Sequence, residues 1–130
     1  MRESKYQHLG MIQNTIGRLA SNSFQIKGWS VVIVSALFAL SAADSNRAFA
    51  LLALFPATIL WILDGYFLLQ ERLFRHLYDC VRIKADETID FSMNTSDFTK
   101  LESWLGCCSS RTLSIFHGAV VISAISVYLI

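Results

Sequence analysis

Two long apolar runs joined by a very short polar turn constrain this sequence more than any other feature. The first run covers residues 25–43 and the second covers residues 48–70, with only residues 44–47 between them. A bilayer core about 30 Å thick needs about 20 largely apolar residues, because a helix rises about 1.5 Å per residue. Both runs approach this length, so we expect two antiparallel membrane-spanning helices that form a hairpin.

The hairpin places one basic and one acidic side chain at the same depth. Lys27 and Asp64 are the only charged residues inside the two runs, and they lie equally far along the chain from the turn. An aspartate at the middle of a spanning helix costs about 2.5–3.5 kcal/mol, and less near the boundary. Three interpretations stay open. Lys27 reaches the head groups while Asp64 lies in the interfacial zone, the two form a pair within or between subunits, or Asp64 is an ion or proton site.

A third apolar run, residues 112–130, ends the chain, and we expect it to span the membrane as well. Of the 130 residues, 54% are hydrophobic and only 16% are charged. A soluble domain of this length would carry more charge and shorter apolar runs. We therefore predict an all-α integral membrane protein that forms a single membrane domain over residues 1–130.

Basic residues set the expected orientation. Ten of the 11 Lys and Arg residues lie at or before the start of the first run, or between the second and third runs; only Arg47 lies in the turn. Because segments rich in Lys and Arg stay in the cytoplasm, we expect the N-terminus and residues 71–110 on that side. The turn and the C-terminus are then expected outside.

Residues 1–23 are expected to form a cytoplasmic amphipathic helix. Apolar residues from Leu9 to Leu19 repeat at intervals of three and four, which is the period of one helix face. The second spanning helix continues into residues 71–84 with a similar apolar stripe and no stop signal. We expect the two stripes to pack on each other, with a break or a new helix cap at residues 21–23 before the first span.

Residues 71–110 are expected to form a cytoplasmic stalk followed by an interfacial helix. Ser96 is predicted to cap a short helix that runs through Leu105 and ends at Gly106. The polar residues of the stalk are the expected docking face for a partner protein: Arg72, Arg75, His76 and Asp79.

Small and polar residues of the spans indicate where helices approach each other. Packing, not hydrophobicity, drives helix association in lipid, and small residues allow it. The expected close-packing positions are Gly28, Ala39, Ser114 and Gly118. Three serines of the first span are the expected polar lining of a pore: Ser30, Ser35 and Ser41. Pro56 removes one helix hydrogen bond and predicts a kink in the second span.

The sequence carries no signature of an enzyme. It has no glycine-rich phosphate loop, no nucleophile elbow and no His, Cys and carboxylate residues at metal-binding spacing. Arg111 and His117 fit a loose spacing of some ribonucleases, but His117 lies inside the third run, where RNA would not reach it. The basic residues are too sparse for a nucleic-acid site. We therefore expect no enzymatic activity, no cofactor, no metal and no nucleic-acid partner.

Several stretches resemble one group of small bacterial membrane proteins. They are KYQHLGMIQNTIGRLASNSFQIKGWSV (residues 5–31), DSN (residues 44–46) and LDGYFLLQERLFRHLYDCVR (residues 63–82), with SWLGCCSSRTL (residues 103–113) as a weaker match. Together they resemble the SLATT group, whose members have two spanning helices and a long cytoplasmic helix and are found with anti-phage and nucleotide-signalling loci. The third apolar run departs from that two-helix plan.

The resemblance implies an effector that assembles in the bacterial inner membrane and compromises it after phage is sensed. We expect an oligomeric pore or membrane-disrupting effector, with the lipid bilayer and further copies of the chain as partners and with Lys27 and Asp64 as gating residues. The alternative is a non-conducting anchor or regulator that docks a soluble sensor or signalling protein through its cytoplasmic helices. A pore is expected to lose activity on Asp64→Leu, whereas an anchor is expected to fail when Arg75 and His76 are changed.

Overall fold

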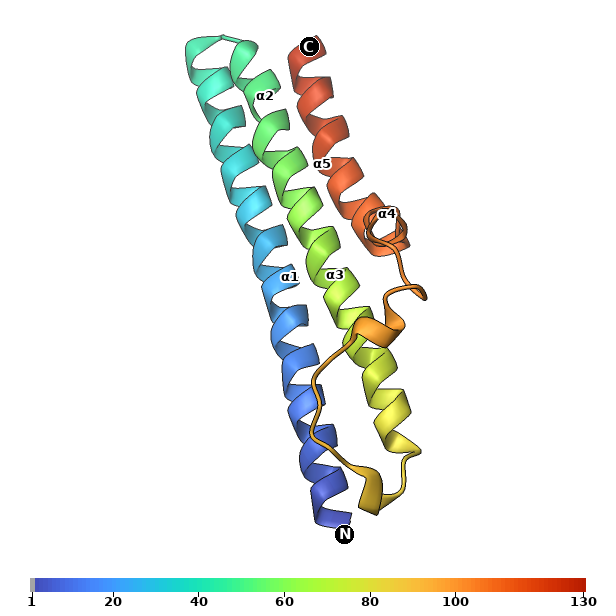
Figure 1. The fold of residues 1–130 in the computed structure, drawn as a ribbon. Helices are drawn as coiled ribbons and strands as arrows, with labels where there is room; N and C mark the ends of the chain where they lie inside the picture. Colours follow the sequence, from blue (N-terminus) through green and yellow to red (C-terminus); the bar gives the residue numbers. More distant parts are fainter. Residues whose placement is uncertain (1) are drawn as a thin grey trace.

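The computed structural model describes residues 2–130, and every regular element in that part of the chain is a helix. The long helices are α1 (Arg2–Asp44), α3 (Leu54–Arg82) and α5 (Arg111–Leu129). The short ones are α2 (Ala48–Leu52), α4 (Trp104–Cys108) and two 3-10 turns, η1 (Asp86–Thr88) and η2 (Ser96–Phe98). The long helices lie side by side in an elongated bundle, with the C-terminus beside the α1–α2 turn and the N-terminus at the opposite end (Figure 1).

Three stretches are long and apolar enough to cross a membrane: Glu3–Asp44, Ala48–Arg82 and Arg111–Leu129. Within their most apolar windows, only 22%, 28% and 17% of the residues are buried inside the chain. Most residues in these windows are therefore at least partly exposed on the surface of the chain. The prediction of a helical fold with three helices of spanning length is confirmed.

The N-terminal amphipathic segment and the first apolar run form one continuous helix, α1. The expected break at residues 21–23 is wrong. The Ser23 hydroxyl donates to Asp64 and accepts from Lys27, so it does not cap the backbone of a new helix. Serine interrupts helices mainly when its hydroxyl competes for nearby backbone groups, and at Ser23 that hydroxyl is engaged by other side chains.

The turn between α1 and α2 is closed by local hydrogen bonds. Ser45 adopts a positive φ of 52°, and the Asn46 side-chain oxygen accepts the N–H of Ala48 at 3.0 Å. The Arg47 guanidinium donates to the main-chain oxygen of Ile130 at 3.0 Å. This last bond ties the end of α5 to the hairpin turn.

The second half of the hairpin is interrupted once. Only Ala53 separates α2 from α3, three residues before Pro56. Proline has no N–H to give to the carbonyl four residues earlier, which here belongs to Leu52. The helix pattern is interrupted by one residue near Pro56, and the kink expected there stays a prediction.

The N-terminal half of α1 packs on the end of α3, as the two apolar stripes predicted. Ile12 and Ile16 of α1 are buried against Leu77 and Val81 of α3. Full burial of an aliphatic side chain contributes about 1.5–3 kcal/mol, so this contact stabilises the packing of the two segments. Partly buried side chains surround it: Leu9, Phe74, Tyr78, Ile89, Met93 and Phe98.

A second apolar cluster joins the hairpin to α5 at the other end of the bundle. Its buried members are Val34 of α1, Ala53 between α2 and α3, Ala57 of α3, and Ala124 of α5. Three of the four are alanines, which allow the helices to approach closely. The bundle therefore has one packed region toward each end, and α1 and α3 take part in both.

The segment between α3 and α5 differs from its prediction. No α-helix starts at Ser96, because η2 ends at Phe98 and the backbone stays irregular up to Ser103. Ser103 caps α4 instead, with its Oγ accepting the N–H of Gly106 at 2.9 Å. The predicted helix from Ser96 to Leu105 is thus wrong, and Gly106 lies inside α4 rather than at its end.

Candidate functional site

Asp64 of α3 is completely buried where the three long helices meet. Its Oδ1 accepts a hydrogen bond from Ser23 of α1. Its Oδ2 lies 2.7 Å from the Lys27 Nζ and 2.7 Å from the His117 Nε2 of α5. The Lys27 ammonium also donates to the Ser23 Oγ at 2.8 Å. We call these four residues the Asp64 cluster; each long helix contributes at least one of them.

The cluster compensates a carboxylate that has no access to water. An unpaired buried charge costs several kcal/mol, whereas a charge with an opposite partner and hydrogen bonds on both oxygens can be tolerated. The Asp64 side chain is 0% exposed and that of Lys27 is 18% exposed, so the ammonium lies between the buried acid and the outside. The structure thus joins Lys27 and Asp64 within one chain, which is one of the arrangements left open by the sequence.

His117 completes the cluster, although sequence reasoning did not place it there. Its Nε2 must be the donor, because an ionised carboxylate only accepts hydrogen bonds. The ring stacks on Trp61, with centroids 5.7 Å apart and planes 13° apart, and meets the ring of Phe116 edge-on. Its Nδ1 is buried without a hydrogen-bond partner among the described residues. A lone histidine in an apolar run was the only available signal, and it did not reveal its partner.

The three serines expected to line a pore do not share one face of α1. Ser30 is fully buried, three residues beyond Lys27, and its hydroxyl has no partner in the described part of the chain. Ser41 is also buried, whereas Ser35 is exposed. Within a single chain these residues therefore form no common polar lining.

The small residues expected at helix contacts lie in open surroundings. A β-carbon added to Gly28 or Gly118 would meet no atom within 4 Å. Ala39 is exposed and Ser114 is half-buried. None of the four thus marks a close approach of helices inside this chain, and the exposed positions stay available to a neighbour.

Among the glycines, the tightest contact with another helix occurs beside Asp64, at Gly65. A β-carbon at Gly65 would overlap the Cys108 Sγ and lie 3.2 Å from the Trp104 Nε1. Two indole hydrogen bonds fix the same contact: Trp61 donates to the Cys108 carbonyl at 3.0 Å, and Trp104 donates to the Ile62 carbonyl at 3.2 Å. Helix α4 is therefore seated on α3 next to the cluster. Sequence reasoning did not single out Gly65.

Two of the four residues expected to dock a partner are used inside the chain. Arg72 lies 3.4 Å and His76 3.1 Å from the Glu102 carboxylate, and the His76 ring stacks on Phe98. These contacts attach the irregular segment before α4 to the stalk part of α3. Arg72 and His76 are therefore not free for a partner in this conformation.

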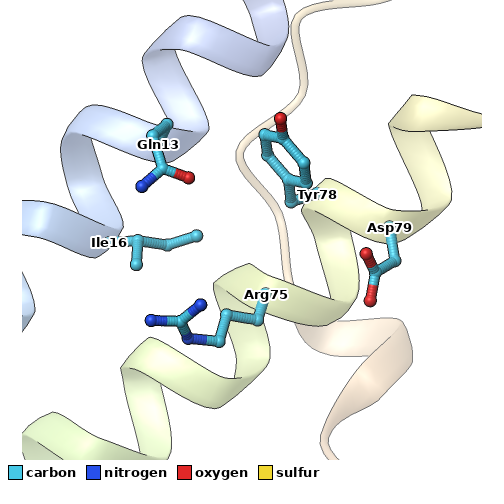
Figure 2. A pocket seen from close by; sticks show the side chains of 5 residues that line it. All are labelled: Gln13, Ile16, Arg75, Tyr78 and Asp79. Carbon is cyan, nitrogen blue, oxygen red and sulfur yellow. The ribbon is translucent and has the colours of Figure 1, made fainter.

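The other two docking candidates line a hollow beside α3, and of the two only Arg75 extends toward α1 (Figure 2). Arg75 and Asp79 line a cavity of about 270 Å³ together with Tyr78 of α3 and with Gln13 and Ile16 of α1. Figure 2 shows Arg75 extending from α3 toward α1, below the ring of Tyr78. Glu71 pairs with Arg75 at 2.9 Å along the helix. The hollow is polar. The parts of α1 and α3 that line it belong to the half of the bundle opposite the α1–α2 turn (Figure 1).

The described residues contain no group of three His, Cys, Asp or Glu side chains placed to hold a metal ion. Comparisons of the chain with protein-family models, with curated protein sequences and with solved structures found no match. The Asp64 cluster is therefore the feature of the molecule from which a function is best inferred.

Proposed function

We propose that this chain is a small membrane effector whose copies assemble and permeabilise the bilayer. We further propose that the Asp64 cluster is a latch, meaning that its contacts hold the three long helices of the resting subunit together. The observation that best supports this proposal is the Asp64 carboxylate, which is fully buried among three apolar helices of spanning length. A charged residue in such a place is costly and usually serves ion movement or conformational control. A purely structural bundle would gain stability from apolar packing at the same position.

The outward-facing apolar residues support insertion into a bilayer. Lipid chains can cover the large apolar side chains that the bundle leaves exposed, including Val32, Phe55 and Ile122. The distribution of Lys and Arg supports an N-terminus in the cytoplasm and a C-terminus outside. The resemblance to SLATT proteins supports the inner membrane of a bacterium and a role in defence against phage.

Assembly from several copies follows from the packing of a single chain. Side chains fill the space between three packed helices, so one subunit does not enclose an aqueous path. Ser35 and Ala39 are spaced by four residues on α1, and both are exposed. Such a small-residue pair allows the close approach of another helix in lipid, which supports a homo-oligomer.

The latch holds the three helices together in the resting form. Because Lys27 and His117 both contact Asp64 inside one chain, these residues do not line a passage between subunits in this arrangement. Opening would require the cluster to separate and expose its charges to water. We therefore expect replacement of Asp64 to raise permeability, in contrast to the loss of activity expected from the sequence.

The test is ion flux through vesicles reconstituted with the purified full-length chain. A potassium gradient with valinomycin sets a membrane potential, and a voltage-sensitive dye follows its loss. Wild-type protein is expected to dissipate the potential and Asp64→Asn to dissipate it faster. The matched control is Asp79→Asn, the same chemical change on the same helix at a side chain that is 66% exposed; it should match the wild type.

Two results would count against this function. Vesicles that contain correctly inserted wild-type and Asp64→Asn protein and keep their potential would exclude permeabilisation. An equal increase with Asp64→Asn and Asp79→Asn would exclude a specific latch at the cluster.

The second candidate function is a membrane anchor that docks a soluble protein, and the hollow in Figure 2 favours it. A polar cavity between two helices outside the most apolar part of the bundle could receive a partner's side chain. Replacing both Arg75 and Asp79 by alanine should then abolish protection against phage in cells. The same variant should leave vesicle permeability unchanged, which separates the anchor from the pore.

A further inference from the structure

Two donors share one oxygen atom at the centre of the Asp64 cluster. The Lys27 ammonium and the His117 imidazole both lie 2.7 Å from Asp64 Oδ2, while Ser23 takes Oδ1. The carboxylate carries one negative charge and the ammonium one positive charge. With a neutral imidazole the cluster is therefore balanced.

The hydrogen bonds determine which imidazole nitrogen can accept a proton. Because Nε2 donates to the carboxylate, a neutral His117 has its lone pair on Nδ1. That nitrogen is buried and has no hydrogen-bond partner among the described residues. Nδ1 is therefore an unused base on a ring whose other nitrogen, Nε2, contacts the Asp64 carboxylate.

We propose that His117 takes up a proton at Nδ1 and thereby releases Lys27 from Asp64, so that acid opens the latch. The inference rests on the proposed function and names the signal that acts on the same site. One N–H bond forms at Nδ1, and one O–H bond of a hydronium ion breaks. No electron is transferred, and the net charge of the cluster changes from zero to plus one.

Lys27 is the residue that leaves the cluster, because its side chain is partly exposed and can move to the outside of the bundle. Its side chain is 18% exposed, whereas that of His117 is 1% exposed and held between Trp61 and Phe116. A lysine stem is long enough to carry the ammonium to the head-group region. When two cations compete for one carboxylate oxygen in a site of low polarity, the mobile one departs and the enclosed one stays.

The charged and titratable groups described around His117 are Lys27, Asp64 and the Cys108 thiol. Helix α1 contributes Lys27 and the neutral Ser23, and helix α3 contributes Asp64 and Trp61. Helix α4 contributes Cys108, and burial raises the pKa of that thiol, so it stays protonated at neutral and acidic pH. Imidazole is the side chain whose charge ordinarily changes between about pH 5 and 8.

The first test observes the proton directly in the full-length protein in lipid. The chain has three histidines, so His8→Gln with His76→Gln leaves His117 as the only one. Solid-state ¹⁵N NMR of labelled histidine should show a protonated Nε2 and a bare Nδ1 at about pH 7.5, and two protonated nitrogens at about pH 5.5. The Nζ signal of Lys27 should shift over the same range.

The second test measures permeability in the vesicles described above. Lowering the pH by two units raises proton activity about 100-fold, and we expect wild-type flux to rise roughly tenfold or more. His117→Gln keeps an N–H donor for Asp64 but cannot take up a proton, so its flux should not respond. His8→Gln is the matched control, a buried histidine far from the cluster, and should respond as the wild type does.

The outcomes separate this inference from the proposed function. If Asp64→Asn leaks while wild-type flux is insensitive to pH and Nδ1 stays bare, the latch stands and the proton trigger is overturned. If no variant leaks but Nδ1 takes up a proton and the Lys27 signal shifts, the trigger stands and permeabilisation fails. A bare Nδ1 down to about pH 5 overturns the inference even if His117→Gln does not fold.

Discussion

Gly65 and Cys108 touch so closely that a β-carbon built at position 65 would overlap the Cys108 sulfur, which would have to move. Gly65 directly follows Asp64, so the contact seats α4 beside the charged cluster. The indole of Trp61 stacks on His117 and donates to the Cys108 carbonyl, which connects α4 to the cluster through one ring. The position of α4 and the geometry around Asp64 are therefore coupled.

Gly65→Ala should destabilise the protein by about 1–3 kcal/mol, the usual cost of adding volume to a packed site. The methyl group must displace Cys108, whose backbone is held by Trp61. Gly118→Ala is the matched control, because nothing lies within 4 Å of the added carbon. Thermal unfolding in detergent, followed by circular dichroism, should show a lower midpoint for Gly65→Ala alone; equal midpoints would mean that α4 moves freely.

The partners of the buried pair should differ in what their removal costs. Lys27→Met leaves the enclosed Asp64 with Ser23 and His117 only, and breaking a buried pair in this way costs about 3–5 kcal/mol. Asp64→Leu should cost less, because the partly exposed Lys27 can turn outward. The double variant should be less destabilised than the sum of the two. Unfolding in mixed micelles measures all three; strict additivity would contradict a direct pair.

The position of the charged pair could be predicted from the sequence because a hairpin with a short turn fixes depth by simple counting. Lys27 and Asp64 lie equally far from the turn, and the structure places them 2.7 Å apart. The packing of the N-terminal stripe on the stalk was predictable for the same kind of reason. Two apolar faces at helical spacing, on segments already brought side by side, have few other ways to be buried.

The place of His117 in the cluster could not be predicted, because it depends on how α5 rotates against the hairpin. That rotation is set by long-range contacts, among them Ala124 with Ala53 and Ala57 and the bond from Arg47 to Ile130. Local spacing carries no information about them. The same limit explains why the sequence did not locate the glycine at which helices come closest. Gly28 and Gly118 fitted a general pattern, but the close approach is at Gly65, where α4 returns to α3.

The break expected at residues 21–23 was wrong for a different reason. Serine and asparagine favour helix ends because their side chains compete for backbone hydrogen bonds. Ser23 instead binds Asp64 and Lys27, a tertiary contact that removes the competition. Local propensity was overridden at Ser23, whose side chain is engaged by Asp64 and Lys27.

Ile12→Ala should destabilise the contact between α1 and the end of α3 by about 2–5 kcal/mol. Ile12 is fully buried against Leu77 and Val81, and the substitution leaves a cavity there. Met11→Ala, one residue away on the exposed side at 43% exposure, is the control. Hydrogen exchange of α1 amides in lipid should accelerate in residues 2–20 for Ile12→Ala only. Protection that is unchanged in both variants would contradict the packing.

Cys107 should react slowly with thiol reagents, and the pH dependence of that rate reports its burial. Burial raises the pKa of its thiol, and the nearby Arg72 opposes this only in part. The thiolate is the reactive species, so a raised pKa means less thiolate at neutral pH and a rate that climbs only as pH increases toward that value.

A chain that keeps Cys107 alone, through Cys80→Ser and Cys108→Ser, should label roughly tenfold or more slowly than one that keeps the half-buried Cys80 alone. The difference should vanish in denaturing detergent. Equal rates in the folded protein would mean that α4 opens readily, and would remove the support that it gives to the Asp64 cluster.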